Sequence, residues 1–558
     1  MVSNPSTSNR FCRVKLTGAI IFLLLFNGYS RANENGLKFE VSFSQQAHSK
    51  EITGRVYVMI SRDNRREPRL QIGTHGVPFW GKDVEQLPAG TPAVIDSGEF
   101  GYPLESIQHI PAGEYYVQGF VNIYTEFKRS DGHTLWMHND QWEGQHWNRS
   151  PGNLHSAVRK IYLDPNQPQA IKLVCDQVIP PVEIPADTKW VKRIKFKSER
   201  LSKFWGQPIY LGATILLPKG YEENTKTYYP VNYVQGHFSL RAPYGFTPPS
   251  SGESPTRPSR GRAFSNFWMS DDCPRFVAVT FQHPTPYYDD SYAVNSPNNG
   301  PYGDAIIEEL IPAVEKKFRI IAQPYARILS GGSTGGWESL ALQIFHPEFF
   351  GGTFSLCPDP VDFNYFQAVN IYKDKNAYYK EYGWTQVPTP SDRGTDGVVR
   401  LTYKQRNDME RVMGTKGRSG EQIDIFEAVF GPIGSDGYTK PLFDKRTGVI
   451  DPEVAMYWKK NFDLHYYLEK NWNRIGEQLE GKLHIYTGDM DTYYLNPAVV
   501  RLESFLEKTK KPYYDGTVEY GDGQPHCWGP NSVELLKLMA QQVAKNAPEK
   551  SGSRVEAR

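Results

Sequence analysis

The sequence predicts an all-β sandwich followed by an α/β unit with a mostly parallel sheet. At 558 residues the chain is too long for one ordinary domain. From residue 37, short segments such as LKFEVSFS and GEYYVQGFVNIY have the β-branched and aromatic pattern of strands. Later, the apolar run FVAVTF (276–281) alternates with amphipathic segments such as GDAIIEELIPAVEKKF. Strands that alternate with helices are typical of a parallel sheet covered on both faces.

The N-terminus has the pattern of an export signal. Basic residues precede the apolar run LTGAIIFLLLF, and SRA at 30–32 offers small residues where a signal peptidase cleaves. We therefore expect residues 1–32 to be a signal peptide and the mature protein to be secreted or periplasmic. The run is short for a membrane span, and an uncleaved anchor is the alternative. No second span is predicted after signal removal.

Changes in composition divide the rest of the chain. Residues 37–180 are predicted to form a β-sandwich of immunoglobulin-like type. PPVEIP (180–185) is a stiff connector, so 181–204 is assigned to a linker and leading strand. The α/β unit is expected over 205–545, with a disordered tail at 546–558. The Trp- and His-rich stretch 136–155 is interpreted as a long loop between strands, because its histidines lack metal-like spacing, and a ligand or metal site is the alternative.

Charge and composition limit the possible partners. The chain has 63 basic and 62 acidic residues, a net charge of +1, without a block of like charge. This balance argues against nucleic acid as a partner. A small or neutral molecule is the expected ligand, and no cofactor or metal ion is predicted. The turn GSDGY (434–438) offers acidic oxygens to calcium, but an ordinary Asx turn is the preferred interpretation.

Four glycines surround Ser333 in RILSGGSTGGWESLALQIFHPEFF (327–350). They fit G-x-S-x-G, the nucleophile elbow, in which a serine occupies a tight turn between a strand and a helix. A phosphate-binding loop is the other glycine-rich option, but no Lys-Ser or Lys-Thr pair follows at the required place. The flanking strand-like and helix-like segments favour the elbow over a turn with an incidental serine. Ser333 is therefore the predicted nucleophile.

The elbow predicts an acid and a histidine further along the chain, in that order. The segment KLHIYTGDMDTYY gives a strand and then a turn with Asp489 and Asp491. We favour Asp491, which lies just past the turn, and keep Asp489 as the alternative acid. His526 follows a Gly/Asp/Pro loop and precedes an amphipathic helix, so it is the predicted base. His346 and His465 are interpreted as structural.

The oxyanion formed in such a reaction needs preorganised donors. One is the backbone N–H of Thr334, directly after the nucleophile. The other is expected from the loop after the strand YPVNYV, where the N–H of Phe238 is preferred and His237 is possible. A side-chain role for His237 is considered less probable than a structural one.

Residues from about 205 to 545 resemble the putative esterase family of α/β-hydrolases, which includes esterase D and enterochelin esterase-like proteins. The matching segments are YPVNYVQGH, EELIPAVEKKFR, ARILSGGSTGGWESLALQIFHPEFFGG, GDMDTYY and the final HCW. This resemblance implies serine-dependent hydrolysis of carboxylic esters, with Ser333, the Asp489/Asp491 turn and His526 at the matching positions. Relatives act on feruloyl, acetylxylan and siderophore esters, and on mycolyl groups. The resemblance therefore does not specify the substrate.

Two features extend this prediction. A long insertion, roughly 359–470, separates the elbow from the acidic turn, and insertions at this point commonly form a lid that sets substrate choice. Cys357 follows the strand after the elbow helix and Cys527 adjoins His526, so both are expected near the site. A disulfide between them would brace the histidine loop, and two buried free thiols are the alternative.

The predicted function is therefore that of an exported serine esterase. An acyltransferase or a peptidase with the same triad is an alternative, because the acceptor depends on the lid. A non-catalytic binding protein that reuses the fold is a third reading. The ordered set of serine, aspartate and histidine argues against it.

Overall fold

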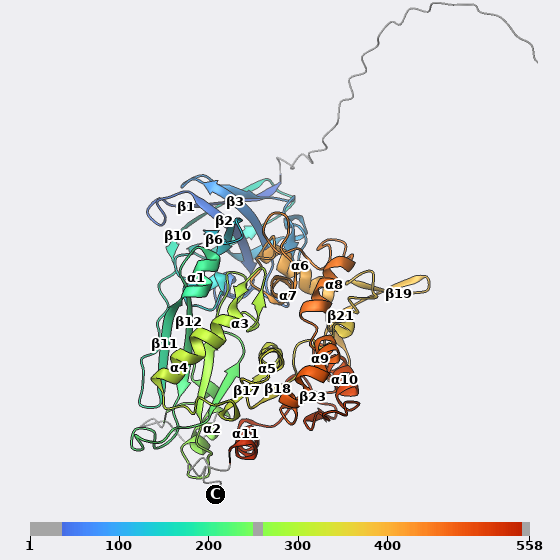
Figure 1. Ribbon diagram of the computed structural model, residues 1–558. Coiled ribbons are helices and arrows are strands. Elements are labelled where there is room, and N and C mark those ends of the chain that lie inside the picture. The colour runs from blue at the N-terminus through green and yellow to red at the C-terminus, as the bar shows by residue number, and fades with distance from the viewer. Residues whose placement is uncertain (1–35, 249–259, 549–558) are drawn as a thin grey trace, which may run out of the picture.

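The computed structural model describes residues 36–248 and 260–548. A β-rich region comes first in the chain, and an α/β region follows and packs against it (Figure 1). The predicted signal peptide, residues 1–32, lies outside the described residues, as does the tail beyond residue 548. Within the described ranges, no helix is both long and apolar enough to cross a membrane.

The β-rich region is one hydrogen-bonded sheet of ten strands. Its order is β4-β1-β10-β8-β6-β2-β3-β5, and β7 and β9 both pair with β6. Only the β1–β10 pair is parallel among these strands. The strands are β1 (Leu37–Phe43), β2 (Ile52–Ser61), β3 (Phe79–Leu87), β4 (Ala93–Ile95), β5 (Gly101–Tyr102), β6 (Gly113–Lys128), β7 (Thr134–His138), β8 (Leu154–Ser156), β9 (Arg159–Leu163) and β10 (Gln169–Val178).

This sheet curls so that β1 and β10 lie over β6. A Cβ atom added to Gly119 of β6 would come within 3.1 Å of Leu173 Cβ and 3.3 Å of Val41 Cγ1. Alternate residues of β1 are buried in the apolar core between these layers, as the period of a strand requires. The all-β prediction for this region is confirmed, whereas its immunoglobulin-like type stays a prediction.

The α/β region is built on an eight-stranded sheet in the order β11-β12-β14-β13-β17-β18-β23-β24. The six strands from β14 to β24 are parallel, and β12 and β11 extend one edge antiparallel. The α/β-hydrolase prediction is thus confirmed. The strands are β11 (Val191–Ser198), β12 (Ile209–Leu216), β13 (Val231–Gln235), β14 (Val277–Gln282), β17 (Arg327–Gly332), β18 (Gly352–Leu356), β23 (Leu483–Gly488) and β24 (Thr517–Gly521).

Helices cover both faces of this sheet. One face packs in a single core with side chains of α1, α3, α4, α5, α9 and α10, and the other with α2 and α11. A π-helical turn, Ile306–Leu310, joins α3 to α4. The helices are α1 (Glu199–Trp205), α2 (Arg260–Trp268), α3 (Tyr302–Ala305), α4 (Ile311–Lys317), α5 (Thr334–Phe345), α9 (Leu464–Leu479), α10 (Asn496–Leu506) and α11 (Ser532–Asn546).

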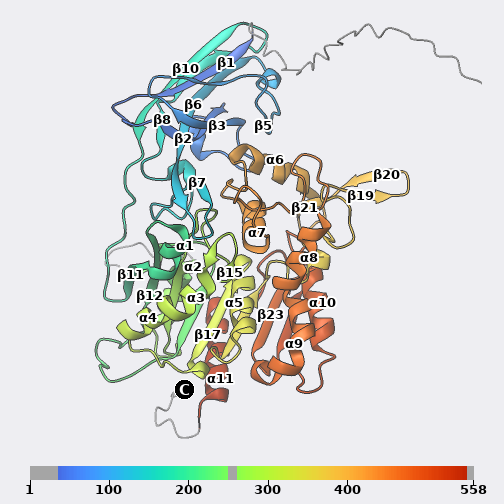
Figure 2. The same cartoon turned by 45° about the horizontal axis from the view of Figure 1, so that its top comes forward.

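A long segment between β18 and β23 carries further elements beside the sheet. Its helices α6 (Tyr403–Met413) and α7 (Gln422–Phe430) lie between the β-rich region and the sheet (Figure 2). We call residues 403–430 the α6–α7 segment. The other elements are β19 (Tyr379–Tyr382), β20 (Thr385–Pro388), β21 (Pro390–Arg393), β22 (Val399–Thr402) and α8 (Pro452–Asn461), and the short pair β15 (Asn295–Ser296) and β16 (Gly300–Pro301) lies earlier in the chain.

Aromatic packing fastens the β-rich region to the α6–α7 segment. Trp147 is 4% exposed and stacks on Tyr57 with ring centroids 4.3 Å apart. The same indole donates a hydrogen bond from Nε1 to the carbonyl oxygen of Ser419, at 3.1 Å. Met409 and Met413 of α6 belong to this apolar cluster. The contact is therefore a continuous core between the two regions.

A buried charge cluster adds to this contact. Arg418, with a side chain 6% exposed, donates to Asp83 Oδ2 at 3.0 Å and to the carbonyl oxygen of Trp136 at 2.8 Å. Arg55 donates to the other oxygen of Asp83 at 2.6 Å and to the carbonyl oxygen of Val412 at 3.0 Å. The guanidinium groups of Arg55 and Arg418 thus donate hydrogen bonds to carboxylate and carbonyl oxygens on both sides of the contact between the β-rich region and the α6–α7 segment.

A buried carboxylate, Asp362, ties the segment after β18 to α9 and α10. Asp362 has a side chain 1% exposed, and its Oδ2 lies 2.7 Å from His465 Nδ1 and 2.6 Å from Arg501 Nε. His465 therefore has a structural contact, as expected from the sequence.

Candidate active site

The nucleophile elbow lies between β17 and α5. Ser333 has φ 58° and ψ −122°, a conformation that L-residues rarely adopt outside such strained turns. A Cβ atom on Gly331 would lie 2.3 Å from the carbonyl oxygen of Gly335, and one on Gly335 would lie 2.2 Å from that of Gln235. The glycines are thus required by the close approach of strand, helix and the loop after β13.

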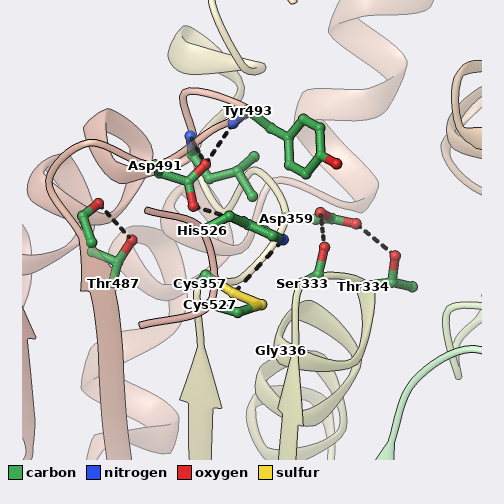
Figure 3. Close-up of a disulfide and its surroundings, with 12 residues drawn as sticks. Ser333, Thr334, Gly336, Cys357, Asp359, Thr487, Asp491, Tyr493, His526 and Cys527 are labelled. Atoms are coloured by element: carbon green, nitrogen blue, oxygen red, sulfur yellow. Dashed lines mark hydrogen bonds and ion pairs between the residues drawn. A yellow bond between two sulfur atoms is a disulfide. The ribbon is translucent and has the colours of Figure 1, made fainter. Parts of the chain in front are cut away.

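His526 and Asp491 come together from two loops at the carboxyl ends of β23 and β24. His526 Nδ1 lies 2.7 Å from Asp491 Oδ2, and the Asp491 side chain is fully buried (Figure 3). The other oxygen of Asp491 accepts the backbone N–H groups of Tyr493 and Leu495. Because Nδ1 faces the carboxylate, Nε2 is directed away from it. Asp489 does not contact His526 through its carboxylate, whose Oδ1 has no partner among the described residues.

A disulfide joins Cys357 to Cys527, across 170 positions of the chain. The bond links the end of β18 to the residue next to His526 (Figure 3). The disulfide hypothesis is therefore confirmed, and the alternative of two free thiols is not. Cys175 and Cys273 are free and buried. The crosslink fixes the histidine loop against the strand beside the elbow.

The Ser333 hydroxyl lies beside a second carboxylate, Asp359. Ser333 Oγ is 3.5 Å from Asp359 Oδ1, whereas Asp359 Oδ2 accepts hydrogen bonds from Tyr292 and Thr334 at 2.7 and 3.0 Å. Burial raises the pKa of Asp359, against the effect of these two hydrogen bonds. Between Ser333 and His526, both among the described residues, no hydrogen bond is formed. In unliganded enzymes such contacts often form only with substrate bound.

Ser333 and His526 open into one cavity of about 340 Å³. The α6–α7 segment supplies one wall of it, which includes the carboxyl of Glu421 and the ring of Phe426. Burial raises the pKa of Glu421 to about 7. The full lining is His237, Ser333, Asp359, Gln367, Arg406, Glu421, Gln422, Ile423, Phe426, Tyr493 and His526.

The two residues after β13 that were candidates for an oxyanion donor line different cavities. His237 lines the cavity that contains Ser333 and His526, whereas Phe238 lines a larger cavity of about 790 Å³ together with Trp142 and His146. The Phe238 ring packs edge-on against Trp142. Thr334 occupies the first position of α5, where helix geometry leaves the N–H without an intrahelical acceptor. No acceptor for this N–H occurs among the described residues, so it is available to a ligand.

Sequence reasoning missed several residues that line the cavity or contact its lining. Asp359 lies just past a parallel strand, at the edge of the sheet where reactive groups gather, and its position in LCPD was a usable signal. Asp289 and Asp290, which contact His237, are an adjacent acidic pair in an aromatic loop. Arg406 and Glu421 come from the α6–α7 segment, and no local pattern places them at the site.

The sequence left two interpretations open for the Trp-rich stretch 136–155 and for the turn 434–438. The structure shows the contacts that each of them makes. Trp142 and Trp147 of the Trp-rich stretch are 5% and 4% exposed, so they serve packing. In the turn 434–438, the backbone N–H of Tyr438 donates to Asp436 Oδ1 at 3.2 Å, which is an Asx turn. In the part of the chain that the structure describes, two groups bring ligand-type atoms within 4.8 Å of one another. These are Cys357 with His526 and Cys527, whose thiols form the disulfide, and His237 with Asp289 and Asp290.

Solved structures of esterases resemble this chain only weakly. A ferulic acid esterase matches with a TM-score of 0.35 at 14% identity, over 63% of this chain and 96% of its own. An S-formylglutathione hydrolase from Agrobacterium tumefaciens gives 0.34 at 13%, over 65% and 97%. A fluorophosphonate-binding serine hydrolase from Staphylococcus aureus gives 0.34 at 14%, over 63% and 98%. No curated protein matches the chain in sequence. At these scores the structures add nothing to the argument from the sheet and the elbow.

A family model provides the remaining comparison. The model described as putative esterase matches residues 211–402, which extend from within β12 to the end of β22 and include the elbow serine and Asp359. The match ends before Asp491 and His526, so it does not bear on those two residues. Residues 211–402 of this chain are therefore similar to the putative esterase family, which supports carboxylic ester hydrolysis as the activity.

Proposed function

We propose that the protein cleaves carboxylic esters through an acyl-enzyme on Ser333. His526 takes the proton of the serine as Oγ attacks the ester carbonyl, and later returns it to the leaving alcohol. Asp491 holds the imidazole with Nδ1 toward its own carboxylate and stabilises the imidazolium that forms. Water then attacks the acyl-enzyme in the same way and releases the acid.

One observation carries this proposal. The His526–Asp491 pair, at 2.7 Å, opens into the same cavity as a serine on a strained elbow. An unpaired N–H on Thr334 beside that serine supports an oxyanion site. For the second backbone donor, the loop at 236–238 remains the candidate, with Phe238 preferred from the sequence and His237 as the alternative.

We also infer that the protein acts after export. Residues 1–32 have the composition of a signal peptide, and a disulfide at the catalytic histidine suits an oxidising compartment. The substrate classes proposed from the sequence are carbohydrate, hydroxycinnamoyl and siderophore esters. A cavity of about 340 Å³ is compatible with an acyl group of the size of a hydroxycinnamate.

The test is hydrolysis of short-chain p-nitrophenyl esters and methyl ferulate by the mature protein and by Ser333→Ala. We expect turnover by the wild type and a loss of at least about 10⁴-fold in kcat for the variant. Product analysis with added alcohols or amines separates hydrolysis from acyl transfer. If neither protein cleaves any ester while both remain folded, the proposal is wrong, and a binding function takes its place.

A further inference from the structure

The imidazole of His237 is held by two carboxylates beside the nucleophile. Its Nδ1 lies 3.1 Å from Asp289 Oδ1 and 3.0 Å from Asp290 Oδ2. The carboxylate side chains are 10% and 1% exposed, whereas His237 is 48% exposed. The ring of Tyr288 packs edge-on against the imidazole, with centroids 5.7 Å apart. One edge of the ring is thus fixed in the protein, and the other faces open space.

The open edge of the ring lies in the catalytic cavity. His237 lines this cavity together with Ser333 and His526, and its Nε2 has no hydrogen-bond partner among the described residues. The preceding residues pack against the elbow, because a Cβ atom on Gly335 would lie 2.8 Å from Gly236 N. His237 therefore leaves the β13 loop directly beside the turn that carries the nucleophile.

The charge of this ring follows from its partners. Desolvation acts to lower the pKa of His237, but the charges and hydrogen bonds of Asp289 and Asp290 raise it well above its ordinary value. An imidazolium carries a proton on both nitrogens. With Nδ1–H engaged by the carboxylates, Nε2–H is left as a charged donor directed into the cavity.

We propose that His237 Nε2–H is a further catalytic donor, which binds the carbonyl oxygen of the ester and stabilises the oxyanion formed when Ser333 attacks. This proposal rests on the esterase function proposed above and deepens it, since it assigns the His237 side chain a role in addition to the backbone N–H groups. The proton stays on His237 throughout. A fixed cation beside the carbonyl oxygen gains most when that oxygen becomes charged, so it lowers the barrier more than it strengthens substrate binding.

Several ionisable groups interact electrostatically with the imidazole of His237 and therefore affect the result of any pH experiment. They are Asp289 and Asp290 before β15, His283 after β14, Glu338 of α5, Asp359 after β18, Glu421 before α7 and His146 before the 3₁₀ turn Trp147–Arg149. Of these, only Asp289 and Asp290 contact His237 through a hydrogen bond. Their substitution is therefore the sharpest way to change its charge.

The first experiment compares His237→Ala with His109→Ala, an exposed histidine of the β-rich region. We expect His237→Ala to lose about 10²- to 10³-fold in kcat, with a much smaller change in KM, and His109→Ala to keep the wild-type kcat. Added imidazole should restore part of the lost rate, because the deleted ring leaves a space open to the cavity. A purely structural role would give neither the split between kcat and KM nor the rescue. A kcat within about threefold of the wild type would overturn the proposal.

A second readout does not require the natural substrate. A fluorophosphonate probe reacts with an activated serine through a charged transition state, so its rate of labelling should fall in His237→Ala and be absent in Ser333→Ala. If the wild type is labelled but cleaves no ester, ester hydrolysis has failed while the role of His237 is still measured by the labelling rate. Equal labelling of the wild type and His237→Ala contradicts the role of His237 alone.

The pH dependence tests the carboxylate pair. In the double variant Asp289→Asn with Asp290→Asn, the pKa of His237 should drop toward its ordinary value. Activity should then fall as pH rises through that lower pKa, whereas the wild type shows no such limb in the same range. Loss of wild-type activity on treatment with a chelator would instead assign His237, Asp289 and Asp290 to a metal ion, and would overturn the proposal.

Discussion

The contact between Arg418 and the β-rich region predicts a specific loss of stability. Arg418→Met keeps the length of the side chain but removes its charge and donors. The substitution leaves Asp83 with one guanidinium instead of two and leaves the carbonyl oxygen of Trp136 without its donor. Breaking a buried pair costs about 3–5 kcal/mol. Because Asp83 is 33% exposed and keeps Arg55, we take the lower end, about 3 kcal/mol.

A surface pair provides the matched control. Arg400 and Asp396 form an ion pair at 2.6 Å with side chains 53% and 52% exposed, so Arg400→Met should cost about 0.5 kcal/mol or less. Urea unfolding followed by tryptophan fluorescence measures both variants, and Trp147 lies at the contact itself. Equal unfolding curves for the two variants would refute the claim that Arg418 fastens the regions together.

The same variant has an expected effect on catalysis. Arg418 lies three positions before Glu421, and both belong to the α6–α7 segment that forms one wall of the cavity. A shift of about 1 Å in such a wall lowers rates by up to about 10²-fold, so we expect kcat/KM for methyl ferulate to fall by about tenfold or more. Arg400→Met should leave kcat/KM unchanged. A stable but fully active Arg418→Met would show that the wall is held by other contacts.

Three further predictions follow from the site and its support. Asp491→Asn should lower kcat by about 10³- to 10⁴-fold without unfolding the protein, as ester kinetics and circular dichroism will show, and a loss below tenfold would argue against its role. The double variant Cys357→Ser with Cys527→Ser should lose up to about 5 kcal/mol of unfolding free energy, since the crosslink closes a loop of 170 residues, and a calorimetric melt equal to that of the wild type would contradict this. For Asp362, burial acts to raise the pKa, but hydrogen bonds hold it well below its usual range, so its stabilisation is present above about pH 4 and lost as pH falls through the folded-state pKa. The difference in unfolding free energy between the wild type and Asp362→Asn should therefore be constant from pH 7 to 5 and shrink below about pH 4, and a constant difference down to pH 2 would exclude this linkage.

The residues that the sequence identified share one property, which is a local pattern. Ser333 is framed by glycines between an apolar strand and a helix, and Asp491 and His526 each follow a strand in the order that the elbow predicts. Cys357 and Cys527 could be paired because both adjoin those same strand ends. In a parallel sheet these ends meet at one edge, so a one-dimensional pattern was enough to place them together.

The remainder of the site depends on contacts between distant residues. Arg55 bonds to Val412, 357 positions away, and Trp147 to Ser419, 272 positions away. No periodicity or motif in the sequence indicates either of these pairs. Likewise, no local pattern pairs His237 with Asp289 and Asp290. These residues lie on two loops, after β13 and after β14, that come together only in the folded protein. The side chain of His237 was accordingly undervalued, because its partners decide its charge.

The disulfide also constrains when the enzyme can become active. Cys527 forms its disulfide with a cysteine that the ribosome makes 170 residues earlier. The β-rich region and the elbow are therefore synthesised and able to fold while the histidine loop is still missing. Until His526 has been synthesised, the proposed nucleophile Ser333 lacks its proposed base, and until Cys527 has been oxidised the loop that carries this base is not tied to the end of β18.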